Sequence, residues 1–92
     1  MAVLAAHLLK WQFQPGRRGS SWRRTIREQR RAIAVPLRET PSLTSSLVDP
    51  NGLEAVWADA VARAIDETGL DLFPDACPWT VDQVLDADFY PA

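Results

Sequence analysis

The 92-residue sequence has a single cysteine, a single histidine and no long apolar run. One cysteine excludes an internal disulfide, and one cysteine with one histidine cannot supply the four ligands of a structural zinc site. No segment approaches the roughly 18 consecutive apolar residues that a membrane-spanning helix needs. Only four glycines are present, and they form no glycine-rich phosphate loop. Disulfide scaffolds, zinc modules, membrane spans and P-loop enzymes are therefore excluded.

The residues that are present indicate one folded domain. Hydrophobic residues make up 47% of the chain and charged residues 24%, close to the averages of soluble globular proteins. Four tryptophans supply a large apolar area for so short a chain, which argues against disorder. Since the length suits one small core, we predict a single domain over residues 1–92.

The charges are distributed unevenly along the chain. Residues 1–39 hold nine basic and two acidic residues, a net charge of +7, whereas residues 40–92 hold one arginine and ten acidic residues, a net charge of −9. Such asymmetry can mark a nucleic-acid or membrane-surface partner. It also arises when a basic half folds against an acidic half. We favour the second explanation because it needs no partner and the whole chain carries only −2.

The first thirteen residues predict a helix that is apolar on two faces. Leu4, Leu8 and Trp11 form one stripe at helical spacing, and Leu9 and Phe13 lie on another face. No capping residue precedes this pattern, so we expect the chain to begin inside a larger, N-terminally shortened domain.

A second helix is predicted from an N-cap at Ser20 or Ser21 to about Val35, where Pro36 should kink or end it. Trp22, Ile26, Ile33 and Leu37 form its apolar stripe. An adjacent arc of roughly 120° carries six arginines: Arg23, Arg24, Arg27, Arg30, Arg31 and Arg38.

Three further helices are predicted in the acidic half. A short third helix over 41–47 has only Leu43 and Leu47 as apolar anchors, and residues 49–52 read as a break. A long fourth helix runs from Leu53 to about Thr68 and ends at Gly69.

A short fifth helix opens at Val81, where Thr80 and Gln83 have the spacing of a capping box. No strand or hairpin pattern occurs. The predicted fold class is therefore all-α: a small helical bundle of about five helices, two or three long and two short, without a sheet.

Three segments carry a family resemblance: His7–Trp11; Ser21-Trp22 with Thr25–Arg30; and Phe73-Pro74 with Cys77–Thr80, Leu85-Asp86, Phe89 and Pro91. In this order they resemble the bacterial "domain of unknown function 29" family over essentially all 92 residues. Only the later part of the family pattern is matched, and the leading helices of the family are absent. The chain departs from the pattern at Pro36 and at residues 50–52, where the family is more continuously helical. The resemblance implies an all-helical fold and no assigned activity.

No combination of residues indicates catalysis. His7 lies beside leucines and is better explained as a packing residue, and Cys77 has acidic neighbours where a reactive thiol needs a base and positive charge. Asp82 and Asp86 share one face of a short helix without further metal ligands. We therefore predict no enzyme activity, no cofactor, no metal site and no small-molecule ligand.

The predicted function is protein association. The apolar pattern of the remaining chain offers too little surface to cover both apolar faces of the first helix. Leu4, Leu8, Leu9 and Trp11 are therefore candidates for self-association as a homo-oligomer. The alternative is nucleic-acid binding, with Arg23, Arg24, Arg27, Arg30 and Arg31 on phosphates and Trp22 stacking on a base. Without a secretory-signal pattern or a membrane span, we expect a cytoplasmic protein.

Overall fold

The computed structural model describes residues 1–40, 42 and 50–91. Its elements are α1 (Ala2–Phe13), a 3-10 turn η1 (Pro15–Arg17), α2 (Ser20–Glu39), α4 (Pro50–Thr68) and α5 (Val81–Leu85). The residues described contain no strand, so the predicted all-α class is confirmed. The short third helix predicted over 41–47 lies outside the described residues.

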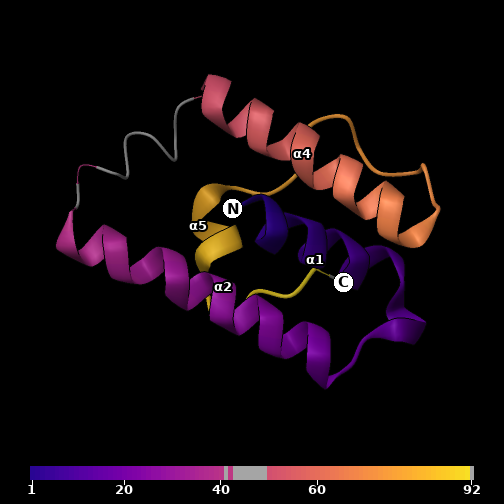
Figure 1. The fold of residues 1–92 in the computed structure, drawn as a ribbon, viewed down its shortest axis with the longest axis horizontal. Coiled ribbons are helices and arrows are strands. Elements are labelled where there is room, and N and C mark those ends of the chain that lie inside the picture. The colour runs from indigo at the N-terminus through magenta and orange to yellow at the C-terminus, as the bar shows by residue number, and fades with distance from the viewer. Residues whose placement is uncertain (41, 43–49, 92) are drawn as a thin grey trace.

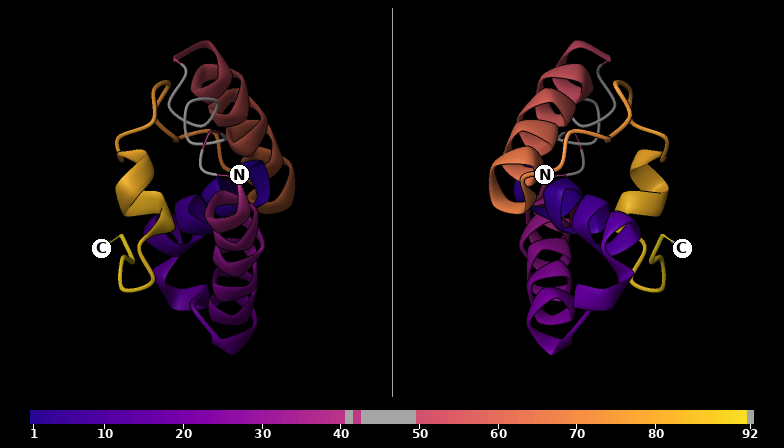
Figure 2. Two further views of the ribbon diagram at one scale, coloured as in Figure 1. Left: turned by 90° about the vertical axis from the view of Figure 1, so that its left-hand side faces the viewer. Right: turned by 90° about the vertical axis from the view of Figure 1, so that its right-hand side faces the viewer.

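Helix α1 is the centre of the fold. It lies between α4 on one side and α2 on the other, and α5 contacts it as well (Figure 1). Seen from the two ends, α5 and the C-terminal segment lie to one side of this stack (Figure 2). Each of the other helices described therefore packs against α1.

The described residues form two core clusters, one on each side of α1. The first joins α1 to α4 and to the chain after α4, and its buried members are Ala5, Ala6, Leu9, Trp57, Ala60, Ala64 and Phe73. The second joins α1 to α2 and α5, and its buried members are Leu4, Leu8, Trp11, Ile26 and Val84. Both apolar faces of α1 are thus used within one chain.

This burial corrects the expectation that α1 leaves apolar side chains uncovered. Leu4, Leu8 and Leu9 are 0% exposed and Trp11 is 6% exposed. The expectation was wrong because α5 adds Val84 to the cover that α2 supplies, while α4 covers the opposite face. These four side chains are therefore not a free surface for self-association.

Helix α2 departs from its prediction at both ends. It begins at Ser20 with Gly19 as its N-cap, and no side chain caps it, so neither predicted serine has that role. It also continues through Pro36 to Glu39. Pro36 stands in the last turn of the helix, and its missing N–H removes one intrahelical hydrogen bond. The residue that would accept this bond is Ala32, four positions earlier, and Ala32 is exposed to water. Proline is therefore tolerated at this position. The amide of Thr40 then donates to the Pro36 carbonyl over 2.8 Å.

Helix α4 begins at Pro50, so the predicted break is wrong over residues 50–52, the part of it that the structure describes. Proline is favoured at a first helical position, and this signal outweighs the turn-like Asn51-Gly52 pair. The predicted end is confirmed: Gly69 has a φ of 72°, and its amide donates to the Ile65 carbonyl over 2.8 Å. The chain departs from the family pattern at Pro36 and at residues 50–52, and the structure is helical at both places, in α2 and in α4.

The capping box predicted before α5 is present. The amide of Gln83 donates to Thr80 Oγ1 over 3.1 Å, and the amide of Thr80 donates to Gln83 Oε1 over 2.9 Å. These bonds satisfy two amides at the start of a five-residue helix that has few bonds of its own.

Thr80→Ala is therefore expected to lower the free energy of unfolding by about 0.5–2 kcal/mol, because one of these amides loses its acceptor. Urea denaturation followed by circular dichroism measures the change. Thr80→Ser retains the hydroxyl and should stay close to the unmodified chain. Equal stability of all three proteins would show that the capping box does not stabilise α5.

Candidate interaction surface

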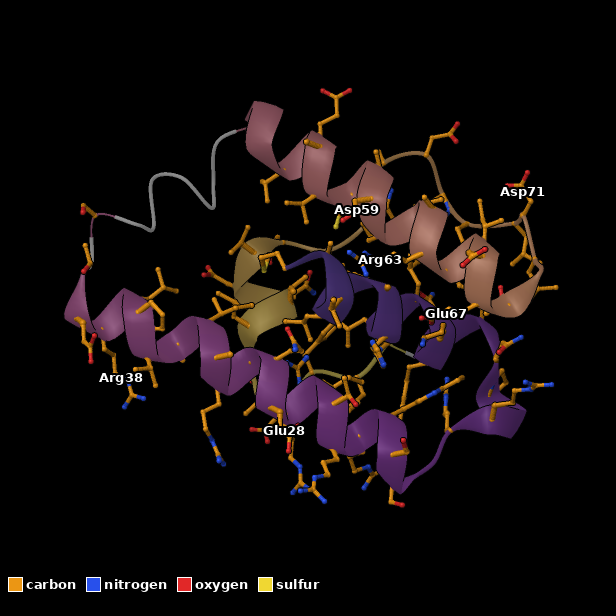
Figure 3. The ribbon with its side chains drawn as sticks, in the orientation of Figure 1. Glu28, Arg38, Asp59, Arg63, Glu67 and Asp71 are labelled. Atoms are coloured by element: carbon orange, nitrogen blue, oxygen red, sulfur yellow. The ribbon has the colours of Figure 1, made fainter. Side chains whose placement is uncertain are left out.

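An exposed row of arginines covers the side of α2 that points away from α1. We call this side the basic face, and it consists of Arg24, Arg27, Arg31 and Arg38 with Val35 among them. At 100° per residue, these five positions fall within an arc of about 80°. The buried Ile26 lies on the opposite side of the helix. In Figure 3 nitrogen-tipped side chains, Arg38 among them, line the outer edge of α2.

The charges of the two halves of the chain do not neutralise each other across the fold. The structure describes three ion pairs: Lys10–Glu67, Arg24–Glu28 and Arg63–Asp59. Only the first joins the basic half to the acidic half. Because α2 and α4 lie on opposite sides of α1, their charged outer faces are held apart (Figure 1). Among the described residues, the explanation favoured from composition therefore holds only locally, at the Lys10–Glu67 pair and where Asp86 and Asp88 lie near Arg30.

Arg30 belongs to the interior, although the sequence groups it with the surface arginines. It is 5% exposed. Its guanidinium donates to three carbonyls of the C-terminal segment, those of Val84 at 2.9 Å, Ala87 at 3.4 Å and Phe89 at 2.6 Å. Arg30 thus holds this segment against α2 and is not available to a phosphate or a partner.

Arg23 lies at the border of the basic face, beside aromatic rings. Its guanidinium carbon is 5.4 Å from the ring centre of Trp11 and 5.7 Å from that of Tyr90. Arg18 approaches the same indole at 5.2 Å, and its Nε donates to the Trp11 carbonyl over 2.7 Å. Arg18 and Tyr90 were not predicted from the sequence, since no local pattern indicates that Trp11 and Tyr90 lie side by side. A surface groove of about 420 Å³ lies at this place, and it is lined by Trp11, Arg18, Gly19, Ser20 and Arg23.

Trp22 does not present a free ring for stacking. It is half-buried against the cluster formed by α1, α2 and α5. The Lys10 ammonium lies 5.3 Å from its ring centre. The stacking role predicted for Trp22 in nucleic-acid binding would therefore compete with contacts that the ring already makes within the fold.

A groove of about 300 Å³ adjoins the basic face. Its lining combines charge with small apolar side chains: Arg27, Arg30, Arg31, Ala34, Leu85 and Ala87. It lies where α2 meets the end of α5. A partner on the basic face would therefore contact apolar surface in this groove as well as the guanidinium groups of Arg27 and Arg31.

The described residues contain no group of three or more His, Cys, Asp or Glu side chains placed to hold a metal ion. Burial raises the pKa of the Cys77 thiol, which keeps it protonated at neutral pH. Asp82 and Asp86 are both exposed.

His7 is half-buried on α1, where its Nδ1 lies 2.8 Å from the Val3 carbonyl oxygen. Burial lowers the pKa of His7, the nearby Lys10 cation lowers it further, and the bond to Val3 opposes the shift. Between the lowered pKa and its ordinary value of about 6.5, the unfolded chain binds more protons than the folded one.

We therefore expect the free energy of unfolding to fall as the pH decreases from about 7 to about 5. His7→Gln removes the titrating ring and should flatten this part of the profile, while the losses caused by carboxylates at lower pH remain. Urea denaturation at several pH values measures both profiles. Identical profiles for the two proteins would exclude His7 as the cause.

The fold and its surface define a small all-α domain with a basic face on one helix. Among residues 1–40 and 50–91, no helix is both long and apolar enough to cross a membrane. The family model described as "Domain of unknown function DUF29" matches residues 1–90, so the chain belongs to this family and the resemblance seen in the motifs is confirmed. No curated protein and no solved structure matches the chain.

Proposed function

We propose that this domain is a protein-interaction module that binds an acidic protein surface through the basic face of α2. One observation carries the proposal: Arg24, Arg27, Arg31 and Arg38 are exposed on a single side of one helix, and of these four only Arg24 takes part in an ion pair of the described residues. Guanidinium groups form bidentate hydrogen bonds with carboxylates, so such a row favours an acidic partner.

Apolar surface among the arginines favours a protein over a nucleic acid. Val35 is 41% exposed within the basic face, and Ala34 and Leu85 line the adjoining groove. Protein interfaces bury apolar side chains at their centre and are enriched in arginine. A phosphate backbone gains nothing from contact with Val35.

Nucleic-acid binding is the alternative, since the same guanidinium groups can contact phosphates. Glu28 and Glu39 are exposed along one edge of the basic face and would repel either kind of anionic partner, so they do not decide between the two. Two residues assigned to nucleic-acid contact from the sequence argue against the alternative: Arg30 is buried and hydrogen-bonded, and Trp22 packs partly buried against the core.

The test is a titration with two labelled probes, an acidic peptide that has leucines between its glutamates and a duplex DNA. We expect the peptide to bind more tightly at physiological salt. Arg31→Glu should weaken peptide binding by at least about tenfold, because a salt bridge becomes a repulsion. Val35→Ser, which changes no charge, should weaken it by about threefold through lost apolar contact.

The matched control is Arg17→Glu, which makes the same charge change at an exposed residue outside the basic face. It should bind the peptide within about twofold of the unmodified chain. Tighter binding of the duplex than of the peptide, with no effect of Val35→Ser on either probe, would replace this proposal with the nucleic-acid alternative.

A further inference from the structure

We propose that the acidic surface bound by the basic face is the outer side of α4 on a second copy of this chain. This inference rests on the proposed function, because it uses the same basic face and names its partner. Copies would associate head to tail, with α2 of one copy on α4 of the next.

The outer side of α4 has acidic residues at the spacing of the arginines. Asp59 and Asp66 are exposed there and stand seven residues apart, or about 10.5 Å along the helix. Arg24, Arg31 and Arg38 repeat at the same interval on α2. Two neighbouring arginines of one copy can therefore face both aspartates of another copy at once.

The side chains on the surface beside the two aspartates are small. Ala55, Ala58 and Ala62 are exposed beside them, so the long arginine side chains and Val35 can approach the α4 backbone closely. We call these three alanines with Asp59 and Asp66 the acidic face.

The local partner of Asp59 does not prevent this docking. Asp59 pairs with Arg63 at 3.3 Å, but both side chains are about half exposed. Exposed pairs of this kind contribute little to stability and exchange partners readily. Asp66 takes part in none of the ion pairs described.

The arrangement of the helices makes the contact one-directional. The views in Figures 1 and 2 place α2 and α4 on opposite sides of α1, so the outer faces of the two helices point away from each other. A copy that docks its basic face on a neighbour still presents its own acidic face. Such a heterologous contact extends into a chain or closes into a ring. The surface area buried between two helix faces falls below about 1,000 Å², so the association is weak and transient.

The test uses the full chain and two charge reversals. In sedimentation equilibrium at about 200 μM protein and about 50 mM NaCl, we expect an average mass of at least about 1.5 times the monomer, falling to the monomer at about 500 mM NaCl. Arg31→Glu and Asp66→Lys should each be monomeric, because each replaces an attractive pair within the contact by a pair of like charges. An equimolar mixture of the two variants should associate again, since each reversed face meets its opposite.

Two controls make the same charge changes at exposed residues elsewhere: Arg17→Glu in η1 and Asp88→Lys in the C-terminal segment. Both should associate like the unmodified chain. A monomer at every concentration, or a mixture of variants that does not associate, would overturn the inference. Binding of the acidic peptide probe, measured in parallel, would in that case still support the proposed function, and its absence would remove both.

Discussion

Leu8→Ala is expected to lower the free energy of unfolding by about 3–5 kcal/mol, the upper part of the range for truncating a buried leucine. Leu8 is 0% exposed and belongs to the cluster that also contains Ile26 of α2 and Val84 of α5. Since three helices meet at this side chain, none of them can close the resulting cavity without moving away from the others. The cavity therefore persists and adds to the lost burial.

Urea denaturation at several protein concentrations measures this effect. Leu72→Ala is the control, because Leu72 is 52% exposed and its truncation should cost no more than about 0.5 kcal/mol. A loss below about 1 kcal/mol for Leu8→Ala would contradict the packing described for α1.

Arg30→Met is expected to lower the free energy of unfolding by about 2–4 kcal/mol, since hydrogen bonds from a charged donor are lost and their acceptors remain. Methionine keeps much of the apolar stem but donates no hydrogen bond. The carbonyls of Val84, Ala87 and Phe89 then lose their common donor. We expect the chain after α5 to detach before the rest of the domain unfolds.

Limited proteolysis and urea denaturation together test this prediction. Arg30→Met should be cleaved in residues 86–91 at a denaturant concentration that leaves the rest of the domain intact. Arg27→Met is the matched control, because Arg27 is exposed on the same helix and should change stability by no more than about 0.5 kcal/mol. Equal stability and equal cleavage of both variants would show that Arg30 does not hold the segment.

Local signals predicted much of the fold because they depend on neighbouring residues alone. The capping box at Thr80 and the left-handed Gly69 are complete within a few residues of sequence, and both are present. The first residues of α2 and α4 were predicted wrongly, since competing local signals stand side by side there. Gly19 caps α2 beside two serines, and Pro50 starts α4 before an Asn-Gly pair.

The surface was harder to predict because burial depends on residues far apart in the sequence. Helical spacing groups Arg30 with the exposed arginines, yet its hydrogen-bond partners lie 54 to 59 residues further along the chain. The same difficulty affected Leu4 and Leu8. Their spacing shows that α1 has two apolar faces but not that the short α5 helps to cover one of them.

Nuclear magnetic resonance of the isotope-labelled full chain, titrated with the acidic peptide probe, shows which residues the peptide contacts. If the basic face binds the peptide, the shift changes should be largest at Arg24, Arg31, Val35 and Arg38, smaller at Leu85 beside the adjoining groove, and slight at Arg17. The amide of Arg30 should move less than that of Arg31, because its side chain stays engaged with the C-terminal segment. Changes confined to other helices, or no change at peptide concentrations that saturate an arginine-rich control peptide, would contradict binding by the basic face.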